Sequence, residues 1–258
     1  MRITFPFPAT ARRTAVALLL AFAPLPGVSD PDDGDREPVL LPEADQPGWN
    51  AIGRVNVAGL RRRGMCTGTL IAPDLVLTAA HCLYGADGRP ARPEDVHFVA
   101  GWRQGDFKAH RIGDQVRIDP DFVNDESPAP ERIAYDTGIL VLSEPIDSEE
   151  IAALPPAGMP ETPVPLTLIG YRQDRPHALS LQPHCEITHR SAVAPVGGGY
   201  VGLDCPVISG ASGAPVLWES PAGWRVVAVV SASVSGSGGV RTLAPLADAA
   251  RRNVGLSN

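Results

Sequence analysis

The chain of 258 residues predicts an all-β fold built from two sets of about six short strands. Gly (26 residues) and Pro (27 residues) are abundant and aromatic residues make up only 5%, which is typical of many turns and few long helices. Short apolar runs recur between turn residues on both sides of a proline-rich stretch at 144–165. This pattern fits two antiparallel barrels or a single sandwich, and composition alone does not choose between them.

The first 29 residues have the pattern of an export signal. Arg2, Arg12 and Arg13 give a basic start, 14–23 is a short apolar run, and small residues follow near Ser29. The run is too short to span a membrane as a helix. We therefore expect 1–29 to be a signal peptide and the mature chain to be secreted or periplasmic.

A different composition follows the signal. Residues 30–48 are acidic, rich in proline and without periodicity, which predicts an unstructured leader or pro-segment. The ordered body is then expected to begin near Trp49.

Six segments have the pattern of strands in an N-terminal half at 49–143. They occupy 52–58, 67–71, 75–78, 96–100, 111–118 and 138–142. Ala72-Pro73-Asp74 separates two of them as a turn. The run at 138–142 is almost entirely apolar, as expected of a strand buried on both faces.

The stretch 144–165 holds six prolines, a density that excludes a packed element and predicts the connection between two halves. A C-terminal half at 166–258 follows. Its expected strands are 166–171, 185–188, 201–203, 214–218, 224–230 and 240–243. Residues 246–254 could form a short terminal helix.

Charge and cysteine content limit the partners. The formal net charge is −7 and no basic run balances it, which argues against a nucleic-acid partner. We expect no membrane association after signal removal, and a monomer. Four cysteines in an exported chain suggest two disulfides with three possible pairings among Cys66, Cys82, Cys185 and Cys205. No close cysteine pair has zinc-site spacing, so no metal is expected.

Three short motifs carry candidate chemistry. They are Thr78-Ala79-Ala80-His81-Cys82, Tyr135-Asp136-Thr137-Gly138 and Gly210-Ala211-Ser212-Gly213-Ala214-Pro215. A serine hydroxyl is a poor nucleophile alone. It needs a histidine to take its proton, and the histidine needs a carboxylate to fix its tautomer. His81, Asp136 and Ser212 could fill these roles.

Each motif has competitors. Asp119, Asp121 and Asp125 lie in a loop-like stretch and could replace Asp136, and Ser209 is the rival nucleophile. Asp136 is preferred because a carboxylate at the mouth of a buried strand needs a hydrogen-bond partner, which an imidazole provides. Ser212 is preferred because glycines flank it in a turn before an apolar strand.

In the order His, Asp, Ser, these motifs resemble those of the trypsin/chymotrypsin-like serine peptidases. The resemblance implies two antiparallel six-stranded barrels with a short C-terminal helix. It implies a catalytic triad of His81, Asp136 and Ser212, with an oxyanion hole formed by the amides of Gly210 and Ser212. It also favours the disulfide pairs Cys66–Cys82 and Cys185–Cys205. The implied activity is endopeptidase cleavage of proteins or peptides through an acyl-enzyme, without metal or cofactor.

Within this family, the segments Trp49-Asn50-Ala51-Ile52-Gly53-Arg54 and Asp204-Cys205 resemble the bacterial branch that includes V8-like glutamyl endopeptidases. Three departures matter. Ala211 cannot bind a freed N-terminus, as the aspartate of animal trypsins does. Pro206 stands where trypsin-like enzymes carry the aspartate of their pocket floor, and 229–233 lacks the histidine of glutamate-specific relatives.

We therefore expect a pocket for an uncharged side chain, floored by Pro206. The expected substrate-binding strand carries Ser231, Ala232 and Ser233. Two alternatives remain open. One is a non-catalytic relative that keeps the fold for binding, and the other is an esterase-type acyl hydrolase.

Overall fold

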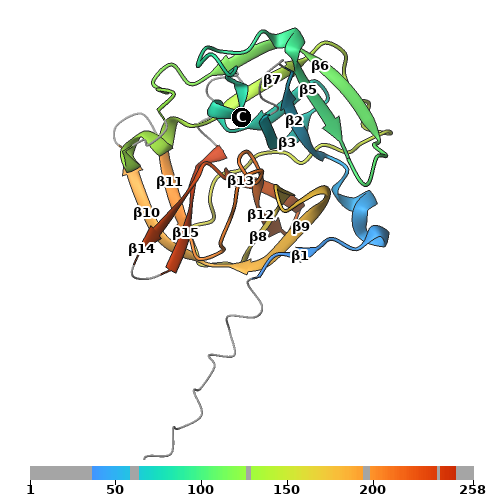
Figure 1. Ribbon diagram of the computed structural model, residues 1–258. Coiled ribbons are helices and arrows are strands. Elements are labelled where there is room, and N and C mark those ends of the chain that lie inside the picture. The colour runs from blue at the N-terminus through green and yellow to red at the C-terminus, as the bar shows by residue number, and fades with distance from the viewer. Residues whose placement is uncertain (1–36, 59–63, 126–128, 194–197, 237–238, 248–258) are drawn as a thin grey trace, which may run out of the picture. The chain divides into compact units, whose positions relative to one another are not determined.

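The computed structural model describes residues 37–58, 64–125, 129–193, 198–236 and 239–247. The fold is all-β, as predicted, with strands grouped into two halves (Figure 1). The expected signal peptide at 1–29 lies outside the described residues. So does nearly all of the terminal helix expected at 246–254.

Six strands of the N-terminal half close into a barrel, in the order β2-β3-β4-β7-β6-β5. All neighbours are antiparallel. The strands are β2 (Ile52–Val57), β3 (Gly64–Ala72), β4 (Leu75–Thr78), β5 (Val96–Ala100), β6 (Ala109–Ile118) and β7 (Gly138–Leu142). Short 3-10 turns η2 (Ala80–Leu83), η3 (Pro93–Asp95) and η4 (Pro130–Tyr135) lie between them.

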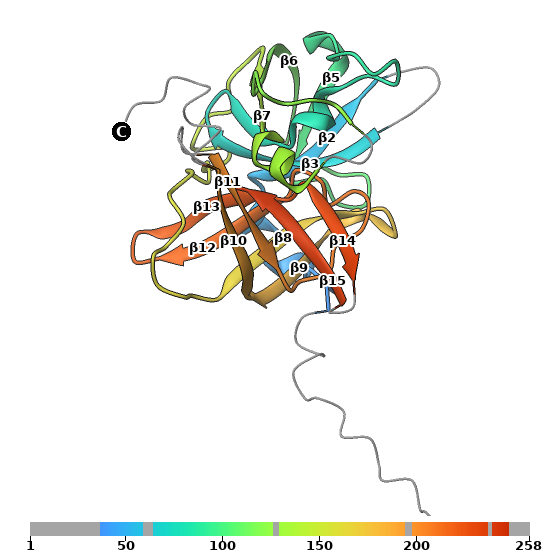
Figure 2. The same cartoon turned by 90° about the vertical axis from the view of Figure 1, so that its left-hand side faces the viewer.

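Eight strands form the C-terminal half as two sheets (Figure 2). Their orders are β1-β9-β8-β12-β13 and β10-β11-β15-β14, in which β1 (Val39–Leu40) is a ninth strand that comes from before the N-terminal barrel. The eight strands are β8 (Leu166–Arg172), β9 (Arg175–Cys185), β10 (Ile187–Val193), β11 (Gly198–Leu203), β12 (Pro215–Ser220), β13 (Gly223–Val229), β14 (Ala232–Gly236) and β15 (Gly239–Pro245).

The two sheets are joined by strands that break and continue. Glu186 alone separates β9 from β10, and only Val230 and Ser231 separate β13 from β14. If each broken pair counts as one strand, the pairings close a six-membered ring in the order β8-β9/β10-β11-β15-β14/β13-β12. This is the same order as in the N-terminal barrel, which confirms the two-barrel prediction.

Three large apolar clusters fill the described part of the fold, and a small fourth one joins Ile133 and Ala134 to Tyr200. One lies within the N-terminal barrel around Phe98 and Leu140, and a second lies within the C-terminal half around Leu168 and Val216. The third contains residues from both halves, among them Leu77, Ile139, Ile169, Tyr171 and Leu217. The two halves therefore share buried apolar surface, which stabilises their mutual placement.

The C-terminal strand predictions were less accurate. The strand expected at 185–188 is wrong, because the chain breaks at Glu186 between two long strands. β9 begins ten residues earlier than expected despite its prolines and polar residues, and its Ser180 and Gln182 are buried. β14 overlaps the expected substrate-binding strand at 231–233, but it begins at Ala232 and continues to Gly236.

The expectation that 30–48 lacks structure is wrong for its second half. β1 (Val39–Leu40) pairs with β9, and the 3-10 turn η1 covers Glu43–Trp49. Leu41 explains this order, because its side chain is 1% exposed within the shared core and its amide donates to Leu179 O at 2.9 Å.

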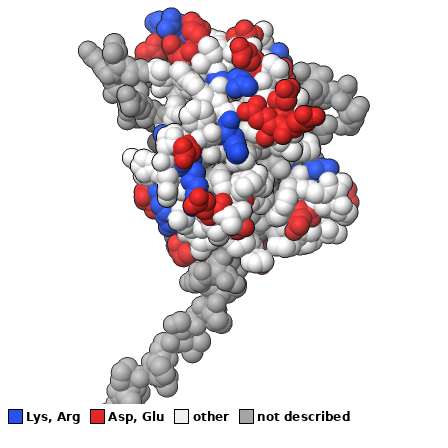
Figure 3. All heavy atoms as spheres, turned by 90° about the vertical axis from the view of Figure 1, so that its right-hand side faces the viewer, with Lys and Arg blue, Asp and Glu red and all other residues white. Residues whose placement is uncertain are grey.

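Charged groups are mixed on the face shown in Figure 3, where Lys and Arg side chains lie scattered among Asp and Glu. That face offers no continuous basic surface of the kind that nucleic acids require. Within the residues that the structure describes, no helix has the length and apolar character needed to cross a membrane.

Candidate active site

His81 and Asp136 are brought together by the pairing of two buried strands. β4 and β7 are neighbours with Thr78 opposite Gly138, so the residues just after β4 meet those just before β7. His81 lies in η2 and Asp136 follows η4. The His81 ring nitrogen Nδ1 is 2.7 Å from Asp136 Oδ2, and the His81 amide donates to Asp136 Oδ1 at 2.9 Å.

The carboxylate of Asp136 is buried, with the whole residue 4% exposed. Burial raises the pKa of Asp136, but its hydrogen bonds with His81 and Ser231 and the charge of His81 outweigh burial and leave that pKa lowered from 3.8. Burial likewise lowers the pKa of His81, whereas the hydrogen bond and charge of Asp136 raise it further, to a net value above 6.5. The site therefore stabilises a carboxylate beside an imidazolium.

A disulfide fixes the histidine segment. Cys66 on β3 is bonded to Cys82, the residue after His81. Ligand atoms of Cys66, His81 and Cys82 lie within 4.8 Å of one another, but both sulfurs are oxidised and cannot act as thiolate ligands. The second disulfide joins Cys185 and Cys205, so each bridge stays within one half of the molecule.

Ser231 has a role that sequence reasoning did not anticipate. Its hydroxyl donates to Asp136 Oδ2 at 2.5 Å, and its amide donates to Leu243 O at 3.0 Å. Both groups are engaged within the protein, so Ser231 positions Asp136, while the pairing of the strand at 231–233 with a substrate backbone stays a prediction. The two residues are 95 positions apart, and no local signal in the sequence links them.

Ser212 lies in a tight turn that packs against the N-terminal barrel. Gly210 and Gly213 on either side have φ of +95° and +80°. Ser212 O accepts from Thr67 N at 2.8 Å, and a Cβ at Gly213 would lie 2.0 Å from Thr67 O and 3.2 Å from Ala79 N. The turn is thus held against the residues that flank Cys66 and precede His81.

No hydrogen bond joins the Ser212 hydroxyl to the His81 ring among the interactions that the described residues make. Catalytic hydrogen bonds in ligand-free enzymes are often long or poorly aligned and tighten only when substrate binds. The structure brings the two segments together and fully assembles the His81–Asp136 half of the constellation.

Two amides in the Ser212 turn remain available. The amides of Ala211, Gly213 and Ala214 donate to Ile208, Val230 and Ala211. Within the described residues, the amides of Gly210 and Ser212 have no acceptor. These are the two donors expected for an oxyanion hole.

The remaining substrate-binding candidates lie in different surroundings. Ala232 and Ser233 lie on β14, at the edge of its four-stranded sheet, where an extended peptide can add as a further strand. Pro206 is partly buried, and its carbonyl accepts from Gln182 Nε2 at 2.9 Å.

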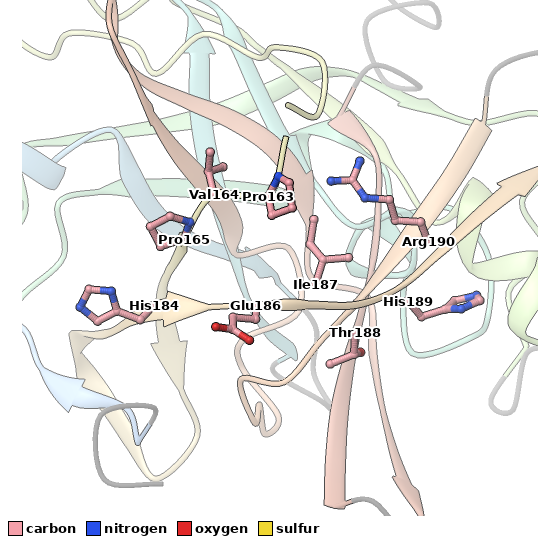
Figure 4. A pocket seen from close by; sticks show the side chains of 9 residues that line it. All are labelled: Pro163, Val164, Pro165, His184, Glu186, Ile187, Thr188, His189 and Arg190. Carbon is pink, nitrogen blue, oxygen red and sulfur yellow. The ribbon is translucent and has the colours of Figure 1, made fainter. Parts of the chain in front are cut away.

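A cavity of about 330 Å³ lies directly beside the His81–Asp136 pair. Phe122, Ile133 and Ala232 contribute to its walls. A larger cavity of about 650 Å³ lies elsewhere, between 163–165 and the β9–β10 junction, and contains none of the candidate catalytic side chains (Figure 4). Size therefore does not identify the active site here.

Comparisons with known proteins agree with this fold. The model of the trypsin-like peptidase domain matches residues 66–229, whereas no curated protein matches. A thermostable serine protease, AL20, from an extremophilic microorganism has 18% identity and a TM-score of 0.61, with 80% of this chain and 96% of that one covered. A Glu endopeptidase solved in complex with MPD has 19% identity and a TM-score of 0.64, covering 86% and 96%.

Protease Anisep from Arthrobacter nicotinovorans has 16% identity and a TM-score of 0.58, with 76% of this chain and 90% of that chain covered. At such identities, the structural matches establish a common fold. The family match spans more than half of the sequence and includes all three candidate motifs. This chain belongs to the trypsin-like peptidase domain family.

Proposed function

We propose that the protein is an exported serine endopeptidase with His81, Asp136 and Ser212 as its catalytic triad. Ser212 attacks the peptide carbonyl while His81 takes its proton. His81 then donates this proton to the leaving amine, and water hydrolyses the resulting acyl-enzyme by the same sequence of proton transfers. Asp136 orients His81 and stabilises its charged form.

The observation that carries this proposal is the buried carboxylate of Asp136 bonded to both the ring and the amide of His81. A structural histidine needs no such arrangement. The site holds an imidazole in one orientation and favours its protonated form, which a general base must reach during the reaction. The free amides of Gly210 and Ser212 support the oxyanion hole.

The substrate's acyl portion is proposed to pair with Ala232 and Ser233 on the β14 edge. Its side chain would be uncharged, because Pro206 and the small residues of 231–233 offer no counter-charge.

The test compares Ser212→Ala with Ser209→Ala on unfolded protein substrates and on simple esters. We expect Ser212→Ala to abolish cleavage and Ser209→Ala to retain it. Full activity in a folded Ser212→Ala variant would contradict the assignment. Ester turnover without peptide cleavage would indicate an esterase, and the absence of both would indicate a binding protein.

We also propose that residues 1–29 are removed on export and that 39–48 are retained. The two disulfides are compatible with an extracellular location. Retention follows from the burial of Leu41, since its removal would expose the shared core. N-terminal sequencing of the secreted protein tests this, because a start after Leu41 would contradict it.

A further inference from the structure

A third cavity, of about 400 Å³, lies on the face of the N-terminal barrel that carries Arg54. Its walls include Arg54, Asn56, Met65, His97, Val99 and Trp102. No acidic residue lines it. A basic cavity is unusual in this acidic chain, whose net charge is −7.

Arg54 is held in place without a counter-ion. Its guanidinium carbon lies 5.3 Å from the ring centroid of Trp102, and Nη2 donates to Asn56 Oδ1 at 3.3 Å. No carboxylate pairs with it anywhere in the described part of the chain. Burial lowers the pKa of Arg54, as expected for a charge that has lost water and gained no anion.

Two hydrogen-bond donors at this cavity lack acceptors. Arg54 Nε and Trp102 Nε1 are both buried and unpartnered among the described residues. Both belong to side chains that line the cavity. Buried donors are normally satisfied, so these two show that the site lacks acceptors. Because Nε and Nε1 have almost no accessible surface, a carboxylate in the cavity would meet the outer guanidinium nitrogens of Arg54, whose charge has no counter-ion among the described residues.

The cavity adjoins the proposed nucleophile. Arg54 pairs with Thr67 across β2 and β3, and Asn56 pairs with Met65, so these four side chains share one face of the sheet. Thr67 Oγ1 donates to Gly210 O at 3.0 Å, and a Cβ at Gly210 would lie 2.6 Å from Met65 Cε. The same face of the barrel therefore supports the Ser212 turn and lines the cavity.

This cavity shares no lining residue with the one beside His81, which includes Ala232. If the acyl portion of a substrate follows 231–233, the cavity at Arg54 faces the portion beyond the cut. We propose that Arg54 and Trp102 form a carboxylate-binding subsite for the first residues after the cleaved bond. This inference rests on the proposed peptidase function and adds a substrate class to it.

The experiment uses peptides of one sequence whose cut site has been located by mass spectrometry. Glu or Gln is placed at each of the first three positions after the cut, with an amidated C-terminus. A third series carries Gln and ends in a free carboxylate at those positions, which distinguishes a side chain from a chain terminus as the source of the carboxylate. The measured quantity is the ratio of kcat/KM for each charged peptide to that of its neutral partner.

We expect one position to favour the charged peptide by about tenfold, the scale of one charge-assisted hydrogen bond. In Arg54→Gln, this ratio should fall to near one. Arg54→Lys should retain part of it. A merely structural Arg54 would lower both rates together and leave the ratio unchanged.

A fluorophosphonate probe carries no peptide beyond the reacting group. It therefore distinguishes a failure of the proposed subsite from a failure of the proposed peptidase function. If the wild-type protein is labelled at Ser212 but its kcat/KM is the same for charged and neutral peptides, the subsite is overturned and the peptidase proposal stands. Absence of labelling at Ser212 would overturn the peptidase and the subsite together.

Discussion

The two halves of this molecule share one strand order but differ in how their strands run. In the N-terminal barrel the strands are continuous, and β4 and β7 are buried along their whole length. In the C-terminal half two strands break, at Glu186 and at Val230–Ser231. The first half is thus a closed barrel of unbroken strands, whereas two strands of the second half are interrupted.

The two halves also carry different residues of the proposed catalytic triad. The continuous barrel holds His81 and Asp136, whose mutual geometry must be fixed. The interrupted half carries Ser212, and its break after β13 both frees the β14 edge and places the Ser231 hydroxyl on Asp136. An interruption in a strand therefore links the two halves at the proposed active site.

The largest expected effect comes from Asp136→Asn in the N-terminal barrel. We expect kcat to fall by about 10⁴-fold, because the histidine loses its correct tautomer. In the wild type, kcat/KM should fall as pH drops through a His81 pKa above 6.5, since only the neutral ring is a base. In the variant this limb should move to lower pH, because burial, which lowers that pKa, remains while the carboxylate is gone. A limb that does not move would contradict the pairing.

The next largest effect is expected from Gly213→Ala, which disrupts the contact between the halves. A Cβ there would lie 2.0 Å from Thr67 O, at a φ of +80°. We expect a loss of more than about 3 kcal/mol in the free energy of unfolding, measured by denaturant titration. The matched control is Gly223→Ala, where φ is +94° but the nearest atom is 3.9 Å away. Equal losses in the two variants would show that backbone strain, not packing between the halves, dominates.

The disulfides allow the halves to be compared directly. They span 16 and 20 residues, so chain entropy predicts a loss of about 3 kcal/mol for each when both cysteines become alanine. Removal of Cys66–Cys82 should also lower kcat, because that bridge holds η2 and His81. Removal of Cys185–Cys205 should affect stability alone. Equal kinetic effects of the two removals would refute the assigned difference.

The smallest effect is expected from Ser231→Ala. Loss of the hydrogen bond to Asp136 should lower kcat by about tenfold, the scale of a single neutral-donor bond to a charged acceptor. The acidic limb of the pH profile should also shift, which a purely structural change would not cause. Ser233→Ala on the exposed part of β14 is the control and should leave the limb in place.

Sequence reasoning predicted most of the N-terminal barrel because local patterns determine it. β4, β5 and β7 begin and end at the expected residues, since apolar runs bounded by turns define them. It did less well with β9 and β14, whose residues are polar or lie beside prolines, so that no continuous apolar run marks either strand, although each pairs with a strand adjacent in the chain, β8 or β15. The His81–Asp136 pair was anticipated from its motifs, whereas the Ser231 contact and the Arg54 cavity arise only on folding.

The central claim is that a histidine and an aspartate of one half activate a serine of the other. It is tested most directly by treating the folded protein with a fluorophosphonate and locating the modified residue by mass spectrometry. We expect a single adduct on Ser212 that forms far more slowly in His81→Ala. An adduct at Ser209, or the same rate in both proteins, would contradict it.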